Sequence, residues 1–82
     1  MTDAELADRF AAFFKAMYPH ADQELRVDTD LLGEWFVDSF GIVQTVQFIE
    51  DTFDLTLARA DIHADNFASI RALVAFVREK LG

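Results

Sequence analysis

Three stretches of this 82-residue chain place apolar residues at the spacing of an α-helix, and this pattern limits the fold more than any other feature. Residues three and four positions apart lie on one face of a helix, so a regular apolar stripe predicts a buried side. We therefore expect helices over residues 2–17, 39–54 and 70–80. The residues expected to face the core are Leu6, Phe10, Phe13 and Met17, then Ile42, Val46, Ile49 and Phe53, and finally Ile70, Leu73, Val74, Val77 and Leu81.

Local signals mark the ends of these helices. Residues 2–5 (Thr-Asp-Ala-Glu) match a capping box, and Pro19 disfavours helical backbone at the residue before it. Ser69 is expected to cap the last helix, and Arg78 and Lys80 suit its C-terminal turn.

The segments between the helices are irregular. Residues 18–38 show no clear period, and a loop of this length needs apolar side chains that pack into the core. The candidates are Leu25, Val27, Leu31, Leu32, Trp35 and Phe36, among which a short helical turn is possible.

Residues 55–57 form a connector rather than a strand, because the run is short and has no partner run. Residues 59–63 predict one short helix with Ile62 facing inward, and residues 65–66 interrupt the helical pattern. The predicted fold class is therefore all-α, a small bundle of three main helices and one short helix with a long loop before the second helix. Residues 1–82 are expected to form a single domain.

The charge balance limits the function classes. Fifteen acidic and seven basic side chains give a net charge of −8, which argues against nucleic-acid binding and favours basic protein partners. No apolar run approaches the ~20 residues that cross a bilayer, and residues 1–5 do not resemble a signal peptide. We expect a cytoplasmic monomer with no membrane span.

No catalytic or metal site is predicted from the motifs. The chain has no cysteine, no glycine-rich phosphate loop and no nucleophile paired with a base. His20 and His63 are far apart in the sequence, and neither has a second ligand nearby. We therefore expect a protein that is not an enzyme.

The second predicted helix begins with Asp38-Ser39-Phe40. A helix start carries partial positive charge and unpaired N–H groups, so it favours a phosphate. An exposed serine at this point is suited to carry a phosphodiester. Ser69 also stands at a predicted helix start, but its surroundings indicate a structural cap.

Asp38-Ser39-Phe40, followed by Val43, Val46, Ile49, Glu50 and Phe53-Asp54-Leu55, resembles the second helix of acyl carrier proteins and peptidyl carrier proteins. In that family an Asp-Ser-Leu triplet opens the helix, so Phe40 departs from the commoner leucine. The resemblance implies that Ser39 carries 4′-phosphopantetheine derived from coenzyme A, with an acyl or aminoacyl group bound as a thioester. It also implies that Asp38 positions the serine and contributes to recognition by the transferase.

The resemblance further implies a set of partner enzymes. These are a phosphopantetheinyl transferase, an acyl- or aminoacyl-activating ligase, and a downstream transferase or synthase. Several acyl carriers have an acid where Gln44 stands, so the neutral glutamine argues against purely electrostatic docking and favours a discrete carrier in a specialised pathway. Asp38-Ser39-Phe40-Gly41 also resembles D-alanyl carrier proteins and some stand-alone carriers of amino acids or unusual extender units. The partner surface carried over by position comprises Phe40, Val43, Gln44, Gln47, Glu50 and Asp51.

A second hypothesis stays open at this point. An acidic helical interaction module with no prosthetic group would use Ser39 only as a cap, and Phe40, Val43 and Phe48 as its binding hot spot. The nine phenylalanines predict a filled interior, so a carried group is expected to lie outside the core.

Overall fold

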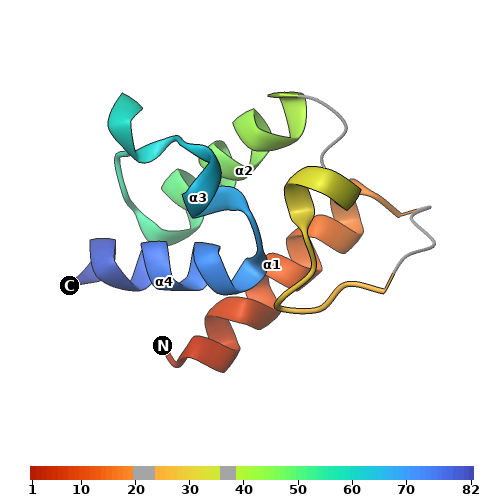
Figure 1. Ribbon diagram of the computed structural model, residues 1–82. Helices are drawn as coiled ribbons and strands as arrows, with labels where there is room; N and C mark the ends of the chain where they lie inside the picture. The colour runs from red at the N-terminus through yellow and green to blue at the C-terminus, as the bar shows by residue number, and fades with distance from the viewer. Residues whose placement is uncertain (20–23, 36–38) are drawn as a thin grey trace.

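The computed structural model describes residues 1–19, 24–35 and 39–82, without the side chains of residues 34, 35 and 39 (Figure 1). This part of the chain contains helices and no strand, which confirms the predicted all-α bundle. In Figure 1, α4 crosses α1 and the two chain termini lie on the same side of the bundle. The elements are α1 (Asp3–Met17), a π-helical turn η1 (Leu31–Trp35), α2 (Ser39–Phe53), a 3-10 turn η2 (Arg59–Asp61), α3 (Ala64–Phe67) and α4 (Ile70–Leu81).

The predicted helix caps are confirmed. The Thr2 hydroxyl accepts the Glu5 N–H at 3.2 Å, and the Glu5 carboxylate accepts the Thr2 N–H at 2.9 Å, which completes the capping box. The bond from the Thr2 N–H to the carboxylate is the main cause that lowers the pKa of Glu5. The Ser69 hydroxyl accepts the Ala72 N–H at 3.1 Å and caps α4. Gly82 ends α4 with a φ of +93°, a conformation that glycine adopts without strain.

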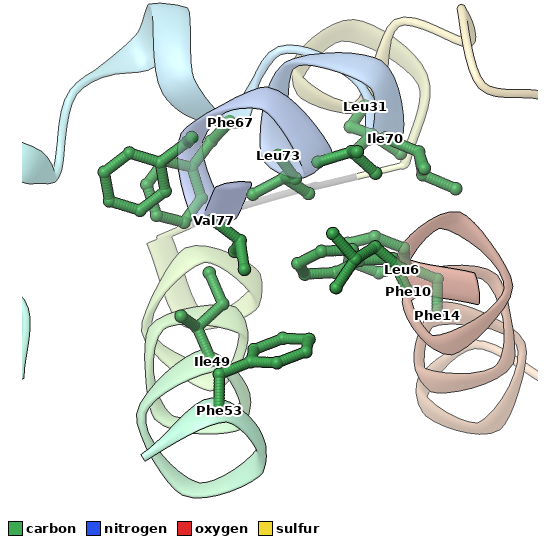
Figure 2. Packing of buried hydrophobic residues seen from close by; sticks show 12 residues of the cluster. Leu6, Phe10, Phe14, Leu31, Ile49, Phe53, Phe67, Ile70, Leu73 and Val77 are labelled. Atoms are coloured by element: carbon green, nitrogen blue, oxygen red, sulfur yellow. The ribbon is translucent and has the colours of Figure 1, made fainter. Parts of the chain in front are cut away.

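The core lies between α1, α2 and α4 (Figure 2). Side chains from these three helices point toward one another, joined by Phe67 of α3 and Leu31 of η1. Burial of this apolar surface is the main source of stability in a domain of this size. The fully or nearly fully buried apolar residues are Leu6, Phe10, Phe14, Leu31, Ile49, Phe53, Phe67, Ile70, Leu73, Val74, Phe76 and Val77.

The stripe predicted in α1 needs a correction. Phe14, which was not predicted in the core, is completely buried, whereas Phe13 and Met17 are only half-buried. The buried positions follow a spacing of four residues, and Phe13 turns to the flank of α1, where its ring stacks on Phe48 of α2.

A similar correction applies to α4, where Phe76 is buried and Leu81 is 48% exposed. Leu81 is the last residue of the helix and does not belong to the buried cluster, whereas the ring of Phe76 lies 6.3 Å from that of Phe67. In α2, Ile49 and Phe53 are buried as predicted, and Ile42 and Val46 are half-buried.

The short segment between α2 and α4 differs from the prediction. Residues 65–66 do not interrupt a helix but lie within the four-residue α3, and Ile62 is 41% exposed instead of facing inward. Phe67 takes the inward place and is 1% exposed. A single helical turn is too short to show a periodic pattern in the sequence, so the pattern does not distinguish Phe67 from Ile62 as the inward residue.

The long first loop is pinned to the start of α4. The Leu31 N–H donates to the Ala68 carbonyl and the Arg71 N–H donates to the Val27 carbonyl, each at 2.9 Å. Leu31 is completely buried, and Leu25 and Leu32 are half-buried, as predicted. Val27 is 40% exposed, so its predicted packing is wrong. The Trp35 side chain and Phe36 lie outside the described residues.

An ion pair joins η2 to the end of α4. The Asp61 carboxylate accepts hydrogen bonds from the Lys80 ammonium and the Ala58 N–H, each at 2.9 Å. Both contacts lower the pKa of Asp61 from its ordinary value of 3.8, and the hydrogen bond from Lys80 contributes more than the one from Ala58. Both contacts favour the charged form of the carboxyl.

Truncation of the core is expected to cost far more stability than truncation of the outer face of α2. Ile49→Ala removes a completely buried side chain and should lower the free energy of unfolding by ~2–5 kcal/mol. The control Gln47→Ala changes an exposed residue two positions away and should stay within ~0.5 kcal/mol. Urea unfolding of both variants measures this. A large loss at Gln47 would show that the faces of α2 are assigned wrongly.

The Asp61 contacts also predict a pH dependence of stability. Because the pKa of Asp61 is lower in the folded chain, its contribution is present above about pH 4 and is lost as the pH falls through the folded pKa. Asp61→Asn should therefore destabilise the protein at pH 7 and have a smaller effect at pH 3. Urea unfolding at both pH values, with the exposed Asp65→Asn as control, measures the difference. An equal loss of stability in Asp61→Asn at pH 7 and pH 3 would contradict a lowered pKa of Asp61 in the folded chain.

Candidate functional site

The candidate attachment point lies at the start of α2. Ser39 is the first residue of this helix, so the backbone follows the prediction. The next three residues, Phe40, Gly41 and Ile42, carry no charge, so no acid in this turn opposes a phosphate. The free N–H groups and the helix dipole at this end favour a negative group. The Ser39 side chain and Asp38 lie outside the described part of the chain.

Ser69 is the other serine of the chain, and its hydroxyl has a structural role. Ser69 is half-buried, and its hydroxyl accepts the Ala72 N–H as the cap of α4. Attachment of a bulky group to Ser69 would disrupt this cap and cost about 1 kcal/mol. Of the two serines, Ser39 is therefore the better fit for a covalently bound group.

Beside Ser39, α2 presents apolar side chains to the solvent. Phe40 and Val43 are 61% and 57% exposed, which makes them the most exposed large apolar residues in the described part of the chain. Three positions apart, they are neighbours on one helix face. Farther along α2, Gln47 and Asp51 are exposed and Gln44 is half-buried. All six residues predicted for the partner surface are thus at least partly in contact with solvent, with Gln44 and Glu50 half-buried.

Glu50, the sixth predicted partner residue, has a structural task. Its carboxylate accepts the Leu57 N–H at 3.0 Å, and its backbone carbonyl accepts the Leu55 N–H at 3.2 Å. Asp54, which lies between Glu50 and Leu55, has a φ of +55° and turns the chain out of the helix. Glu50 is half-buried and holds the connector against the end of α2. Sequence reasoning missed this contact because no local motif connects residues seven positions apart.

An aromatic cluster fills the contact between α1 and α2. The rings of Phe13 and Phe48 stack with centroids 4.3 Å apart at an interplanar angle of 18°. Phe10 packs edge-on against Phe48 at 5.6 Å, and Phe53 lies 6.2 Å from Phe48. Offset and edge-to-face ring pairs add stability beyond the area they bury. The cluster therefore fixes α2, and with it Ser39, relative to α1.

A small recess opens next to this cluster on the outer side of α2. Its volume is about 280 Å³, and its lining includes Phe13 and Phe48, whose rings stack on each other. The rest of its lining comes from α2 and consists of Gln44, Gln47, Asp51 and Thr52.

Neither a membrane span nor a metal cluster is found in the described residues. None of the helices in residues 1–19, 24–35 and 39–82 is long and apolar enough to cross a bilayer. The same residues contain no group of three histidine, cysteine or acidic side chains placed to hold a metal ion. His63 is exposed, and His20 is not among the described residues.

Comparison with known families decides the class of the protein. The family model of the phosphopantetheine attachment site matches residues 5–77, which is most of the chain and includes both Ser39 and the whole of α2. The chain belongs to the phosphopantetheine attachment site family. The prosthetic group of this family is 4′-phosphopantetheine, and its members are carrier proteins of the acyl and peptidyl type. Neither the curated proteins nor the solved structures gave a significant match.

Proposed function

We propose that the protein carries an acyl or aminoacyl group on 4′-phosphopantetheine attached to Ser39, and passes it between partner enzymes. The observation that supports this most strongly is the position of Ser39 as the first residue of α2 in a chain that matches the family over residues 5–77. When bound, the arm supplies a terminal thiol that holds the carried group as a thioester. The protein itself does no chemistry in this proposal, since its partners activate and transfer the group.

The chain itself contributes a fixed position for the attachment point and a helix start that favours a phosphate. Ile49 and Phe53 hold α2 in the core, so the helix start stays at a fixed place on the bundle. Backbone N–H groups of the first turn favour the phosphodiester. Asp38, directly before the serine, is proposed to help the transferase recognise this point. A tethered group then meets a docked enzyme at high effective concentration, although docking itself is weak.

The packing of rings inside the bundle supports the proposal that the carried group stays outside the core. Phe10, Phe13, Phe48 and Phe53 occupy the space between α1 and α2 with rings in mutual contact. Insertion of an acyl chain there would require several rings to leave their packed positions, which costs contact energy on every side. A short or polar cargo, such as an aminoacyl group, suits this arrangement.

The proposed partners dock on the outer face of α2. They comprise a phosphopantetheinyl transferase, an acyl- or aminoacyl-activating ligase and a downstream transferase or synthase. Phe40 and Val43 are the contacts nearest the serine, and exposed apolar neighbours of this kind are typical of protein interaction sites. Gln44, Gln47 and Asp51 continue the surface toward the end of the helix, whereas Glu50 supports it from within through its bond to Leu57.

Loading by a transferase tests the attachment site. After incubation with coenzyme A and a broad-specificity phosphopantetheinyl transferase, intact mass spectrometry should show the gain of one phosphopantetheinyl group. Ser39→Ala should abolish the gain, whereas Ser69→Ala, which loses only a helix cap worth about 1 kcal/mol, should keep it. A folded wild-type protein that gains no mass would instead support an interaction module without a prosthetic group.

A charge placed on the apolar part of α2 tests the docking face. Val43→Asp should leave the unfolding midpoint nearly unchanged, because the side chain is exposed, but should raise the transferase KM for the carrier. The matched control is Leu81→Asp, an apolar residue of similar exposure at the end of α4. Steady-state kinetics of loading measure both variants. Equal effects of the two substitutions would contradict a docking surface on α2.

A further inference from the structure

We propose that the buried hydroxyl of Thr45 holds the first turn of α2 closed and thereby positions Ser39 for loading. The Thr45 Oγ1 atom donates a hydrogen bond to the Gly41 carbonyl at 2.8 Å. Gly41 follows Ser39 by two residues and lies in the same turn of the helix. The inference rests on the proposed carrier function for the reaction at Ser39, whereas the contact between Thr45 and Gly41 stands on the described residues alone.

The buried face of α2 changes in character along the helix. Its buried positions are Gly41, Thr45, Ile49 and Phe53, at a regular spacing of four residues. Ile49 and Phe53 place large apolar side chains in the core (Figure 2). Gly41 has no side chain to bury, so this face contributes little apolar packing in the turn that begins with Ser39. That turn therefore depends more than the rest of the helix on hydrogen bonds.

The composition of the first turn also makes it prone to open. Glycine has more backbone freedom to lose on folding than any other residue, and helix ends fray in general. The turn contains no acidic side chain that could interact favourably with the helix dipole. Opening of this turn would move the backbone of Ser39 away from the place that Ile49 and Phe53 fix for the rest of α2.

Thr45 supplies a bond that opposes this opening. Among the side chains that the structure describes, it is the only polar one that is completely buried. Because Thr45 is inaccessible to solvent, water does not compete for its hydroxyl, and the bond to Gly41 satisfies a group that would otherwise be costly to bury. One such bond is expected to raise the ratio of closed to open turn by about threefold to tenfold.

A closed turn matters for loading because it fixes the backbone that carries the reacting oxygen. In this reaction the Ser39 oxygen bonds to the phosphorus that bears the pantetheine arm, and the phosphoanhydride bond of coenzyme A breaks. Adenosine 3′,5′-bisphosphate leaves, and the hydroxyl proton passes to a base of the transferase. The rate depends on close and aligned reacting atoms. Thr45 is buried and acts on them only through Gly41, so it is a positioning residue.

Hydrogen exchange of backbone amides tests the contact without any loading reaction. The amides of Val43 and Gln44 donate to carbonyls of the first turn, so they report its opening. Thr45→Val removes the hydroxyl at nearly constant volume and should speed their exchange about threefold to tenfold relative to the amide of Phe53. Thr45→Ser keeps the hydroxyl, so its exchange at these two amides should stay within about twofold of the wild type.

Steady-state kinetics of loading test the consequence for Ser39. Thr45→Val should lower the transferase kcat/KM for the carrier by about threefold to tenfold. Thr45→Ser should stay within about twofold of the wild type, although it loses a buried methyl group and with it some stability. The matched control is Thr52→Val, the same change at a half-buried threonine near the other end of α2, and it should also stay within about twofold. Urea unfolding shows whether each variant is folded in the assay.

Three results would overturn the positioning role of Thr45. The first is unchanged exchange at Val43 and Gln44 in Thr45→Val, and the second is equal loading of Thr45→Val and the wild type. The third is a loading rate that follows the unfolding midpoint instead of the hydroxyl, so that Thr45→Ser is slow and Thr45→Val is not.

Failure of this inference is separable from failure of the carrier function. A folded wild-type protein that gains no phosphopantetheinyl group refutes the carrier proposal, and the exchange rates then still decide whether Thr45 holds the first turn. If the wild type and Thr45→Val are loaded equally well, the carrier proposal stands and the role of Thr45 is refuted.

Discussion

The burial of aromatic and aliphatic side chains between α1, α2 and α4 is the constraint on which the site depends. A helix of fifteen residues such as α2 is marginal in isolation, so its helical state comes from packing. Ile49 and Phe53 face the core, and Phe48 is held by the rings of Phe10 and Phe13. The position of the helix start, the direction of the helix dipole and the place of Ser39 all follow from this packing.

The polar contacts of the chain divide it into two regions. Ion pairs and hydrogen bonds secure the first loop, η2 and the N-terminus against α4, through residues such as Asp28, Asp61 and Arg78. The outer face of α2 takes no part in these ion pairs and keeps exposed apolar, amide and acidic groups. The proposed docking surface thus lies apart from the ion pairs that secure the fold. We therefore expect a change on the α2 face to alter docking with little effect on folding.

Much of this arrangement was predictable from the sequence because long amphipathic helices leave a strong period. The bounds of α1, α2 and α4 and the caps at Thr2 and Ser69 follow from such local signals. The sequence predicts less well which apolar residue of a helix is buried. Phe13 and Phe14 of α1 are equally apolar, and only the crossing of the helices decides that Phe14 points inward; the same holds for Phe76 of α4. The same holds for the choice between Ile62 and Phe67 around a helix of one turn.

The site shows the same division between local and tertiary information. The position of Ser39 at a helix start and the exposure of Phe40 could be predicted from neighbouring residues. The hydrogen bond from Leu57 to Glu50 forms only when α2 meets the connector, and the stacking of Phe13 on Phe48 only when α2 meets α1. No spacing in the sequence reveals either contact.

The most direct measurement for the central claim is tandem mass spectrometry of proteolytic fragments from protein co-produced with a phosphopantetheinyl transferase. It reports the modified residue itself, rather than the presence of the group. The account predicts that the fragment containing Ser39, and no other, carries the phosphopantetheinyl group on that serine. A group found on Ser69 or elsewhere, or a fully unmodified Ser39 fragment from folded protein, would contradict it.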